Sequence, residues 1–251
     1  MFSIIVCSNR PERAHAIRTH YETLFRDHAH EFILVDDPPS LCEGYTRGLS
    51  QSNGDAVIFS HDDIEFITAD VGARLQRHLD EFDVVGIAGT TRLIDGMWTS
   101  AGDPYCFMVV AYPEAGGLYS VRYAGKGPLC VSDIQALDGC FLACRRTVAT
   151  EVGFDSRAFD GFHFYDLDFT FRAYLRGFRM AVCRDIALIH ASMGHLDEKW
   201  QRYRDRFEAK HREHLSPGER SDMKVVGAML RKEQLPRLCQ PDMLIRSVKW
   251  D

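Results

Sequence analysis

The first 90 residues alternate short apolar runs with helix-forming stretches. Four runs rich in β-branched residues lie at residues 2–8, 31–37, 56–60 and 84–88, and the segments between them, 12–26, 41–51 and 70–81, have helical patterns. Continuous apolar runs are typical of strands buried on both faces, and their alternation with helices favours a parallel sheet covered on both sides. We therefore predict an α/β fold with a mostly parallel central sheet.

The remainder of the chain departs from this alternation. Gly-rich turns and short mixed runs across residues 91–137 predict a small antiparallel addition with loops, and we expect substrate specificity to be decided there. A strand running into a helix follows at residues 139–146, then a helix at 164–176 and strands at 179–183 and 186–190. A long amphipathic helix comes next, with Leu196, Trp200, Tyr203, Phe207 and Leu215 on one face. We predict one domain over residues 1–215 and a C-terminal helical extension over 216–251.

Polar clusters directly follow three of the predicted strands. They are Ser8-Asn9-Arg10, Asp36-Asp37 and His61-Asp62-Asp63. In parallel sheets, ligands bind beyond the carboxyl ends of the strands, so these clusters are candidates for a common site. Carboxylates suit Mg²⁺ or Mn²⁺, and Mn²⁺ also accepts imidazole. Adjacent acids at strand ends also occur as ordinary turn and cap residues, so each cluster alone leaves both interpretations open.

Three later residues are equally ambiguous when taken singly. Asp166 falls in the first turn of a predicted helix, where the helix dipole favours a carboxylate whatever its function. Asp168 has Arg172 four residues later, which a plain helical ion pair explains. His190 ends an apolar strand and has a structural as well as a metal-binding interpretation.

Charge and hydropathy exclude several classes of protein. The formal net charge of -6 argues against a general nucleic-acid binder. No apolar run approaches the roughly 20 residues that cross a bilayer, and the eight cysteines form no CxxC pair, so we expect a reduced, cytoplasmic protein. From Lys199 onward, 13 Lys and Arg face 8 Asp and Glu. This basic region allows peripheral contact with a membrane or another anionic partner, although a solvated helical face explains it as well.

The order of these motifs resembles the GT-A glycosyltransferases, especially the large inverting family 2. Residues 44–63 (GYTRGLSQSNGDAVIFSHDD) are similar to the helix, turn and strand that lead into the Asp-x-Asp metal motif of that family. Residues 138–146 resemble its "dG-x-F-x-x-R-R" segment, and Gly153-Phe154-Asp155 with Tyr165-Asp166-Leu167-Asp168 resembles its "G-x-F-D … E-D-x-D" block. The Ser8-Asn9-Arg10-Pro11 start is closest to the branch typified by the streptomycin-biosynthesis glycosyltransferase-like proteins.

The resemblance implies a function and a set of site residues. It implies that residues 1–90 bind a nucleotide-sugar donor, most simply UDP-linked, and that residues 91–215 bind the hydroxyl acceptor. Asp166 would be the catalytic base of an inverting transfer. A divalent metal, Mn²⁺ or Mg²⁺, would be held by Asp63 with His190 and His61, and the nucleotide would contact Ser8, Asn9, Arg10, Asp36, Asp37 and Asp62. His61 replaces the first Asp of Asp-x-Asp and Tyr165 replaces the acid before the base, which are the two departures from the family pattern.

Three rival functions make different demands on the sequence. A sugar-phosphate nucleotidylyltransferase needs a Gly-rich phosphate loop after the first strand, and Ser8 to Arg13 contains no glycine. A dinucleotide oxidoreductase needs G-x-G-x-x-G after a strand, which is also missing. A degenerate glycosyltransferase that only binds a sugar or a protein partner is compatible with His61 and Tyr165, so it remains the alternative.

Overall fold

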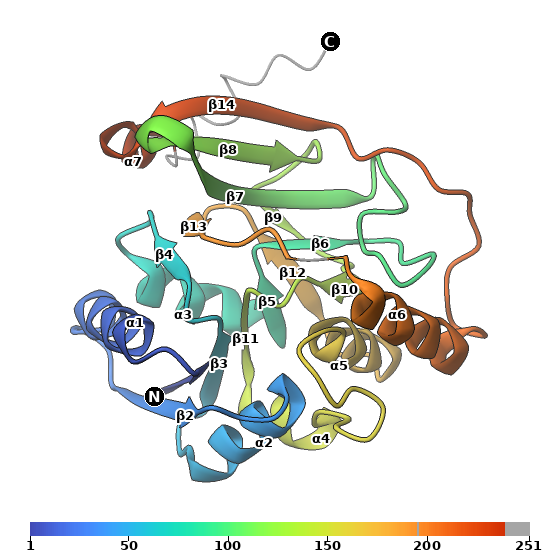
Figure 1. Cartoon of the computed structure of the whole chain (residues 1–251), viewed down its shortest axis with the longest axis horizontal. Coiled ribbons are helices and arrows are strands. Elements are labelled where there is room, and N and C mark those ends of the chain that lie inside the picture. Colours follow the sequence, from blue (N-terminus) through green and yellow to red (C-terminus); the bar gives the residue numbers. More distant parts are fainter. Residues whose placement is uncertain (195, 239–251) are drawn as a thin grey trace.

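A single large sheet forms the base of the molecule. The structure is a computed structural model that describes residues 1–194 and 196–238. Within these residues one sheet has the strand order β2-β1-β3-β11-β5-β12-β9 (Figure 1). Its strands are β2 (His30–Asp36), β1 (Phe2–Ser8), β3 (Ala56–Ser60), β11 (Phe141–Arg145), β5 (Val84–Gly86), β12 (Met180–Cys183) and β9 (Cys130–Val131). Only β11 and β9 run against the other strands, so the predicted α/β fold with a mostly parallel sheet is confirmed.

Helices cover both faces of this sheet. On one face lie α1 (Pro11–Leu24) and α3 (Val71–Glu81), and on the other lie α2 (Leu41–Gln51), α4 (Arg146–Val152), α5 (Tyr165–Leu175) and α6 (Glu198–His211). Successive strand residues alternate between the two cores, because side chains along a strand point to opposite faces. Ile4 packs with α1 and α3, whereas Ile5 packs with α2 and α5.

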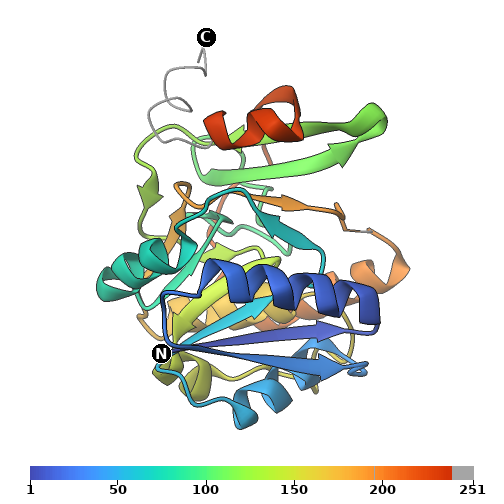
Figure 2. The same ribbon diagram turned by 90° about the vertical axis from the view of Figure 1, so that its left-hand side faces the viewer.

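A second, mainly antiparallel sheet lies above the first. Its order is β10-β6-β7-β13-β4, and β8 and then β14 extend it from the other side of β7 (Figures 1 and 2). The strands are β10 (Ala136–Leu137), β6 (Ala88–Thr90), β7 (Cys106–Glu114), β13 (Leu188–His190), β4 (Ile64–Phe66), β8 (Leu118–Ala124) and β14 (Val225–Arg231). The antiparallel strands expected between residues 91 and 137 are therefore present.

One predicted strand is divided between the two sheets. The apolar run at residues 84–88 forms β5 up to Gly86 and β6 from Ala88, so the chain changes sheets at Ile87. Ile87 is fully buried, and its carbonyl accepts a hydrogen bond from the backbone N–H of Val109. A continuous apolar run indicates burial but not which sheet each residue joins, which is why the sequence pattern did not show the division.

The prediction of a helical extension after residue 215 is wrong for the part that the structure describes. Residues 225–231 form β14, which pairs antiparallel with β8 from Val225 opposite Ala124 to Arg231 opposite Leu118. Only a 3₁₀ turn (Lys232–Gln234) and the four-residue α7 (Leu235–Leu238) follow it. The exposed edge of β8 supplies a full row of backbone partners, and this pairing outweighs the weak local preference of the segment. Residues 239–251 of the predicted extension lie outside the described residues.

Several basic residues of the C-terminal region form ion pairs with acidic side chains. Lys210 contacts Asp155, Arg220 contacts Asp95, and Lys232 contacts Glu65, each at 2.6–2.7 Å. These ion pairs offset part of the local positive charge within the chain itself. Among the described residues, no helix has both the length and the apolar character needed to cross a membrane.

Candidate active site

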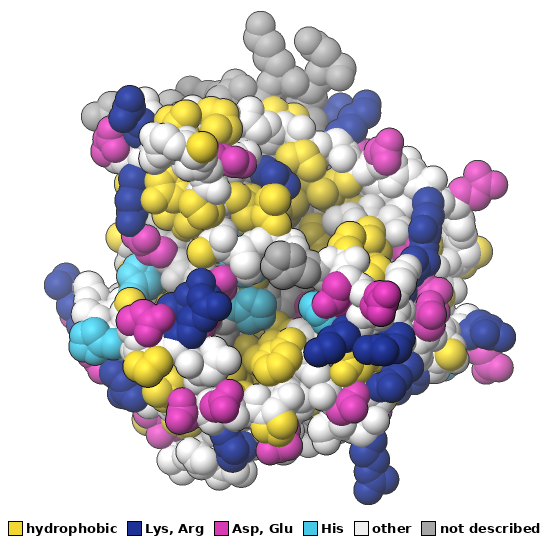
Figure 3. All heavy atoms as spheres, viewed as in Figure 1, with side chains coloured by type: hydrophobic (Ala, Val, Ile, Leu, Met, Phe, Trp, Pro, Cys, Tyr) yellow, Lys and Arg dark blue, Asp and Glu magenta, His cyan; other side chains and the backbone are white. Residues whose placement is uncertain are grey.

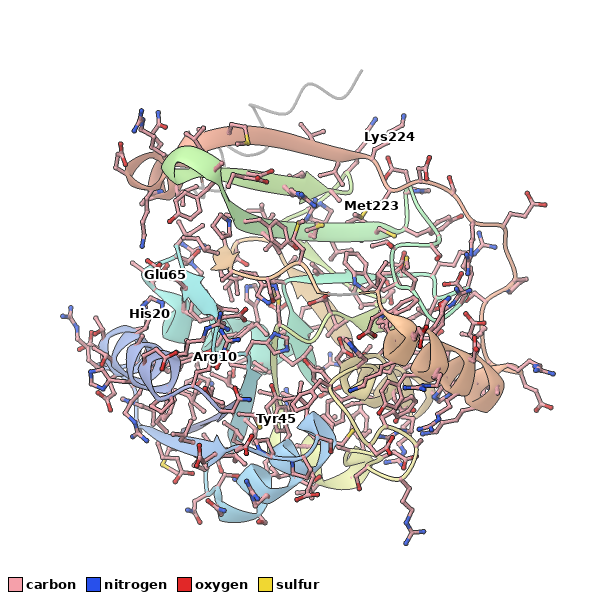
Figure 4. The ribbon with its side chains drawn as sticks, in the orientation of Figure 1. Arg10, His20, Tyr45, Glu65, Met223 and Lys224 are labelled. Carbon is pink, nitrogen blue, oxygen red and sulfur yellow. The ribbon has the colours of Figure 1, made fainter. Side chains whose placement is uncertain are left out.

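Three strand ends meet at one edge of the large sheet. Ser8 at the end of β1 lies opposite Asp36 of β2, and Val6 lies opposite Ser60 of β3. The residues that follow these strands therefore share one edge, as parallel pairing requires. Arg10, in the loop between β1 and α1, lies at this edge (Figure 4). The three polar clusters thus come together as predicted.

A cavity of about 390 Å³, here called the strand-edge cavity, opens at this position. Its lining includes the predicted residues Ser8, Asn9, Arg10, Asp37, Asp62, Asp63 and His61. Ser8 donates a hydrogen bond to Asp62 (2.5 Å), which fixes that carboxylate against the β1 loop. Asp36 is exposed and does not line the cavity, and its carbonyl oxygen accepts a hydrogen bond from Arg47.

Asp63, His61 and His190 form a compact cluster of candidate metal ligands. His190 Nε2 lies 3.3 Å from Asp63 Oδ1 and 3.3 Å from His61 Nδ1, and His61 Nδ1 lies 3.9 Å from Asp63 Oδ1. The pairing of β13 with β4 brings them together, since His190 lies opposite Ile64, the residue after Asp63. Ligands about 2.1 Å from one ion lie roughly 3 to 3.5 Å apart, so this cluster needs little adjustment to hold a divalent cation.

Tyr165 sets the orientation and the tautomer of His61. The Tyr165 hydroxyl donates to the carbonyl of Gly139 (2.9 Å), so its oxygen can only accept from His61 Nε2, which lies 2.6 Å away. The proton of a neutral His61 is therefore on Nε2, and the lone pair of Nδ1 faces Asp63 and His190. Tyr165, which replaces an acid of the family pattern, thus holds the ring of His61, one of the candidate metal ligands.

The surroundings of this cluster shift the pKa values of two of its members. Burial and the neighbouring charge of His190 lower the pKa of His61, which favours the neutral form that binds metal. Burial alone would raise the pKa of Asp63, but the hydrogen bond and charge of His190, with the charge of His61, lower that pKa to about 2. Asp63 is consequently ionised at neutral pH.

Asp166 lies in the first turn of α5. Its Oδ2 accepts the backbone N–H of Gly139 at 2.7 Å. Burial and the neighbouring charge of Asp138 raise the pKa of Asp166 to about 7. Asp138 is itself held by Trp98 Nε1 (3.2 Å) and by the N–H of Cys140 (3.1 Å). A carboxyl group with a pKa near neutrality can both take and release a proton under physiological conditions.

A second cavity of about 410 Å³ opens beside Asp166. It is called the aromatic cavity because its lining includes Trp98, Tyr112, Phe162, Tyr165 and Trp200, together with Asp138 and Met223. Met223 lies just before β14 (Figure 4), so the strand absent from the sequence prediction completes this wall. The two cavities share His61, Phe162 and Ser192. Figure 3 shows histidine and charged side chains gathered between the two sheets on this face.

The remaining acid of the predicted motif has a structural role. Asp168 is fully buried and contacts Arg172 (2.7 Å), Lys210 (2.7 Å) and His211 (2.8 Å). Burial alone would raise the pKa of Asp168, but these partners lower it below the usual value. Asp168 therefore joins α5 to α6 and lines neither cavity.

Three further residues line the cavities but were not predicted from the sequence as site residues. Arg13 lines the strand-edge cavity and lies 3.5 Å from Asp62 and 3.7 Å from Asp63. Asp138 and Ser192 line the aromatic cavity, and the Ser192 hydroxyl is 3.3 Å from His190 Nε2. Arg13 lies only three residues beyond a predicted cluster, and Asp138 opens the segment 138–146 that resembles the family pattern, so both carried a local signal in the sequence.

Comparisons with known proteins agree with this architecture. A family model described as a glycosyltransferase-like family matches residues 3–214, and no curated protein matches the chain. Among solved structures, the mannosyltransferase PcManGT from Pyrobaculum calidifontis, in complex with GDP-Man and Mn²⁺, has a TM-score of 0.51 and 11% identity, covering 97% of this chain and 69% of that one.

Two other structures are similar at lower scores. GalNAc-T7 with UDP, GalNAc and Mn²⁺ has a TM-score of 0.41 and 10% identity, covering 76% of this chain and 43% of that one. A197 from STIV has a TM-score of 0.41 and 12% identity, covering 72% and 80%. At such identities the mannosyltransferase supports the GT-A fold and nothing finer. Because the family model spans most of its length, this chain belongs to the glycosyltransferase-like family, with an α/β fold of the GT-A type.

Proposed function

We propose that the protein is an inverting, metal-assisted glycosyltransferase that moves a sugar from a UDP-linked donor to an acceptor hydroxyl. One observation carries the proposal: the His61, Asp63 and His190 cluster lies where the strand-edge cavity meets the aromatic cavity. A donor in the first cavity and an acceptor in the second would meet beside this cluster. The transferred sugar would then lie between the metal ligands and Asp166.

The strand-edge cavity supplies the groups that a nucleotide requires. We assign the nucleoside contact to Asp37, with Ser8, Asn9, Arg10 and Asp62 around it, and Asp36 is disfavoured because it does not line the cavity. The guanidinium of Arg13, now beside Asp62 and Asp63, is close enough to pair with a diphosphate instead. The cavity thus combines acids for hydroxyl groups with positive charge for phosphate.

The cluster of two imidazoles and one carboxylate fits Mn²⁺ better than Mg²⁺. Mg²⁺ prefers oxygen ligands and water, whereas Mn²⁺ also accepts imidazole nitrogen. Asp63, His190 and His61 would hold the ion, and the ion when bound would offset the negative charge of the leaving diphosphate. Tyr165 would orient His61 through Nε2, the ring nitrogen that does not face the cluster.

Asp166 completes the reaction as the base. The acceptor oxygen attacks the anomeric carbon from the aromatic cavity, and the bond between that carbon and the diphosphate oxygen breaks as the new bond forms. The acceptor proton passes to Asp166, and the nucleoside diphosphate leaves with the bonding electron pair. Attack from the side opposite the leaving group inverts the anomeric configuration. Burial and the neighbouring charge of Asp138 raise the proton affinity of Asp166, which strengthens it as a base.

Calorimetry and a transfer assay together test this proposal. UDP should bind the wild-type protein with Mn²⁺ and lose most of its affinity in EDTA, and Asp63→Ala should remove the metal-dependent part. Asp205→Ala, at an exposed position of α6, is the matched control and should bind as wild type. UDP affinity that is unchanged by EDTA would remove the metal from the proposal. Binding without turnover of any nucleotide sugar would favour the degenerate binding module.

A further inference from the structure

A second cluster of metal-binding side chains lies at the outer edge of the large sheet. It consists of His78 on α3, Cys130 on β9 and Cys183 on β12, whose ligand atoms all lie within 4.8 Å of one another. None of the three lines the strand-edge or the aromatic cavity, and the proposed transfer reaction does not use them. Three separate elements of the fold converge on this point.

The spacing of the two thiols matches that of a bound metal. The sulfur atoms of Cys130 and Cys183 are 3.9 Å apart, and both cysteines are free thiols. Two thiolates that ligate one tetrahedral Zn²⁺ at about 2.3 Å lie about 3.8 Å from each other. The antiparallel pairing of β9 with β12 sets Cys130 directly opposite Cys183, so the sheet itself fixes this separation.

Neighbouring side chains hold the cluster in place. His78 Nε2 contacts both carboxylate oxygens of Asp185, at 2.9 and 3.0 Å, and Arg74 contacts the same carboxylate at 3.4 Å. The buried guanidinium of Arg184 bonds to the carbonyls of Gly125 and Gly127, which secures the turn that leads into β9. Metal-binding histidines are commonly oriented by a carboxylate in this way.

We propose that His78, Cys130 and Cys183 form a binding site for a thiophilic divalent cation, with Zn²⁺ as the natural occupant. Two thiolates and one imidazole are ligands that select Zn²⁺ over Mg²⁺ or Ca²⁺. Asp185 positions His78. Zn²⁺ would offset the charge of the two thiolates, and Asp185 is already paired with Arg74.

The bound cation would fasten the edge of the sheet. β9 has only two residues and pairs with β12 alone among the described strands. A metal bridge would tie β9 to β12 and to α3, and β9 is followed within seven residues by Asp138 in the aromatic cavity. The site is therefore structural, with an indirect connection to the geometry of the active site.

Cobalt substitution tests the proposal directly, because the cluster at His61 contains no thiol. Reduced wild-type protein with one equivalent of Co²⁺ should show thiolate-to-cobalt charge-transfer absorption, which Zn²⁺ should displace. Cys130→Ser and Cys183→Ser should each abolish this absorption, and Asp185→Asn should weaken cation affinity about 10- to 100-fold. Cys42→Ser, a buried cysteine of α2, is the matched control and should keep the absorption.

Thermal stability gives an independent readout. Zn²⁺ at 100 times its Kd should raise the Tm of the wild-type protein by about 5 to 10 °C, and Cys130→Ser should lose this increase. Cys130 is only half-buried at a sheet edge, so this variant is expected to fold. The proposal is overturned if reduced wild-type protein shows neither the absorption nor the Tm increase, or if the absorption survives in both cysteine variants.

Discussion

Replacing Asp166 with asparagine separates proton transfer from every other property of the site. The amide of this variant would keep an oxygen to accept the Gly139 N–H, which now bonds Asp166 at 2.7 Å. The amide cannot take a proton at neutral pH. If Asp166 is the base, Asp166→Asn should lower the rate of transfer by roughly 10² to 10⁴, which is about 3 to 5 kcal/mol of barrier. Affinity for UDP and Mn²⁺ should stay within about threefold of wild type, because Asp166 lines the aromatic cavity and not the strand-edge cavity.

The raised pKa of Asp166 also predicts how stability changes. A folded-state pKa of about 7 against an ordinary 3.8 means that the folded protein binds this proton more tightly than the unfolded chain. The contribution of protonated Asp166 to the free energy of unfolding is therefore fully present below about pH 4 and is lost as the pH rises through about 7. In a fully buried site, a pKa shift of this size would contribute at most about 4 kcal/mol to the free energy of unfolding. Because Asp166 lines an open cavity where solvent screens its charge, we expect about 1 to 2 kcal/mol. Asp166→Asn should be at least as stable as wild type at pH 8.

The assay is the transfer rate at saturating donor across pH 6 to 9, with denaturant unfolding on the same samples. Wild-type transfer should rise with pH through about 7, as Asp166 loses its proton. Asp138→Asn should move this rise to lower pH, because Asp138 is one cause of the raised pKa. Asp205→Asn on exposed α6 is the control and should behave as wild type. Retention of more than a tenth of the wild-type rate by Asp166→Asn, or abolition of transfer by Asp138→Asn alone, would show that the base is misassigned.

Three further substitutions probe the supports of the site. Tyr165→Phe removes the oxygen that accepts from His61 Nε2, so Mn²⁺ affinity measured by calorimetry should fall about 10- to 100-fold, and unchanged affinity would refute the positioning role. Gly139→Ala would place Cβ 2.3 Å from the Tyr165 hydroxyl and 2.4 Å from Asp166 Cβ, so both side chains would have to move. The transfer rate should be largely lost, while the circular dichroism spectrum should remain that of the native protein. Full activity would contradict this packing. Asp168→Asn removes the buried partner of Arg172, Lys210 and His211 and should cost about 3 to 5 kcal/mol of unfolding free energy in a denaturant titration. Because the pKa of Asp168 is lowered in the folded protein, ionised Asp168 should stabilise the fold above the ordinary pKa range of Asp, and this contribution should be lost as the pH falls below that range. An Asp168→Asn variant that is as stable as wild type at pH 7 would refute the structural role.

The local elements of the first half of the chain were predictable because their signals lie within short windows. Residues 2–8, 41–51 and 56–60 have patterns that leave one element as the natural choice, and β1, α2 and β3 have those bounds. The position of the polar clusters at one sheet edge followed from the parallel arrangement alone. The position of Asp166 in the first turn of α5 was predictable from the local helical pattern of residues 164–176.

Local sequence patterns were enough to indicate most of the strands and helices, and they placed acids and histidines at the ends of these elements. Which of those groups meet depends on the tertiary fold. His190 reaches Asp63 through the pairing of β13 with β4, and Tyr165 reaches His61 across 104 residues of chain. β14 is a strand because β8 offers it a partner. The periodicity of apolar residues shows which face of a segment is buried, but it does not show which other segment covers that face. Contacts between distant segments depend on the packing of the whole chain, and a short window of sequence does not contain that information.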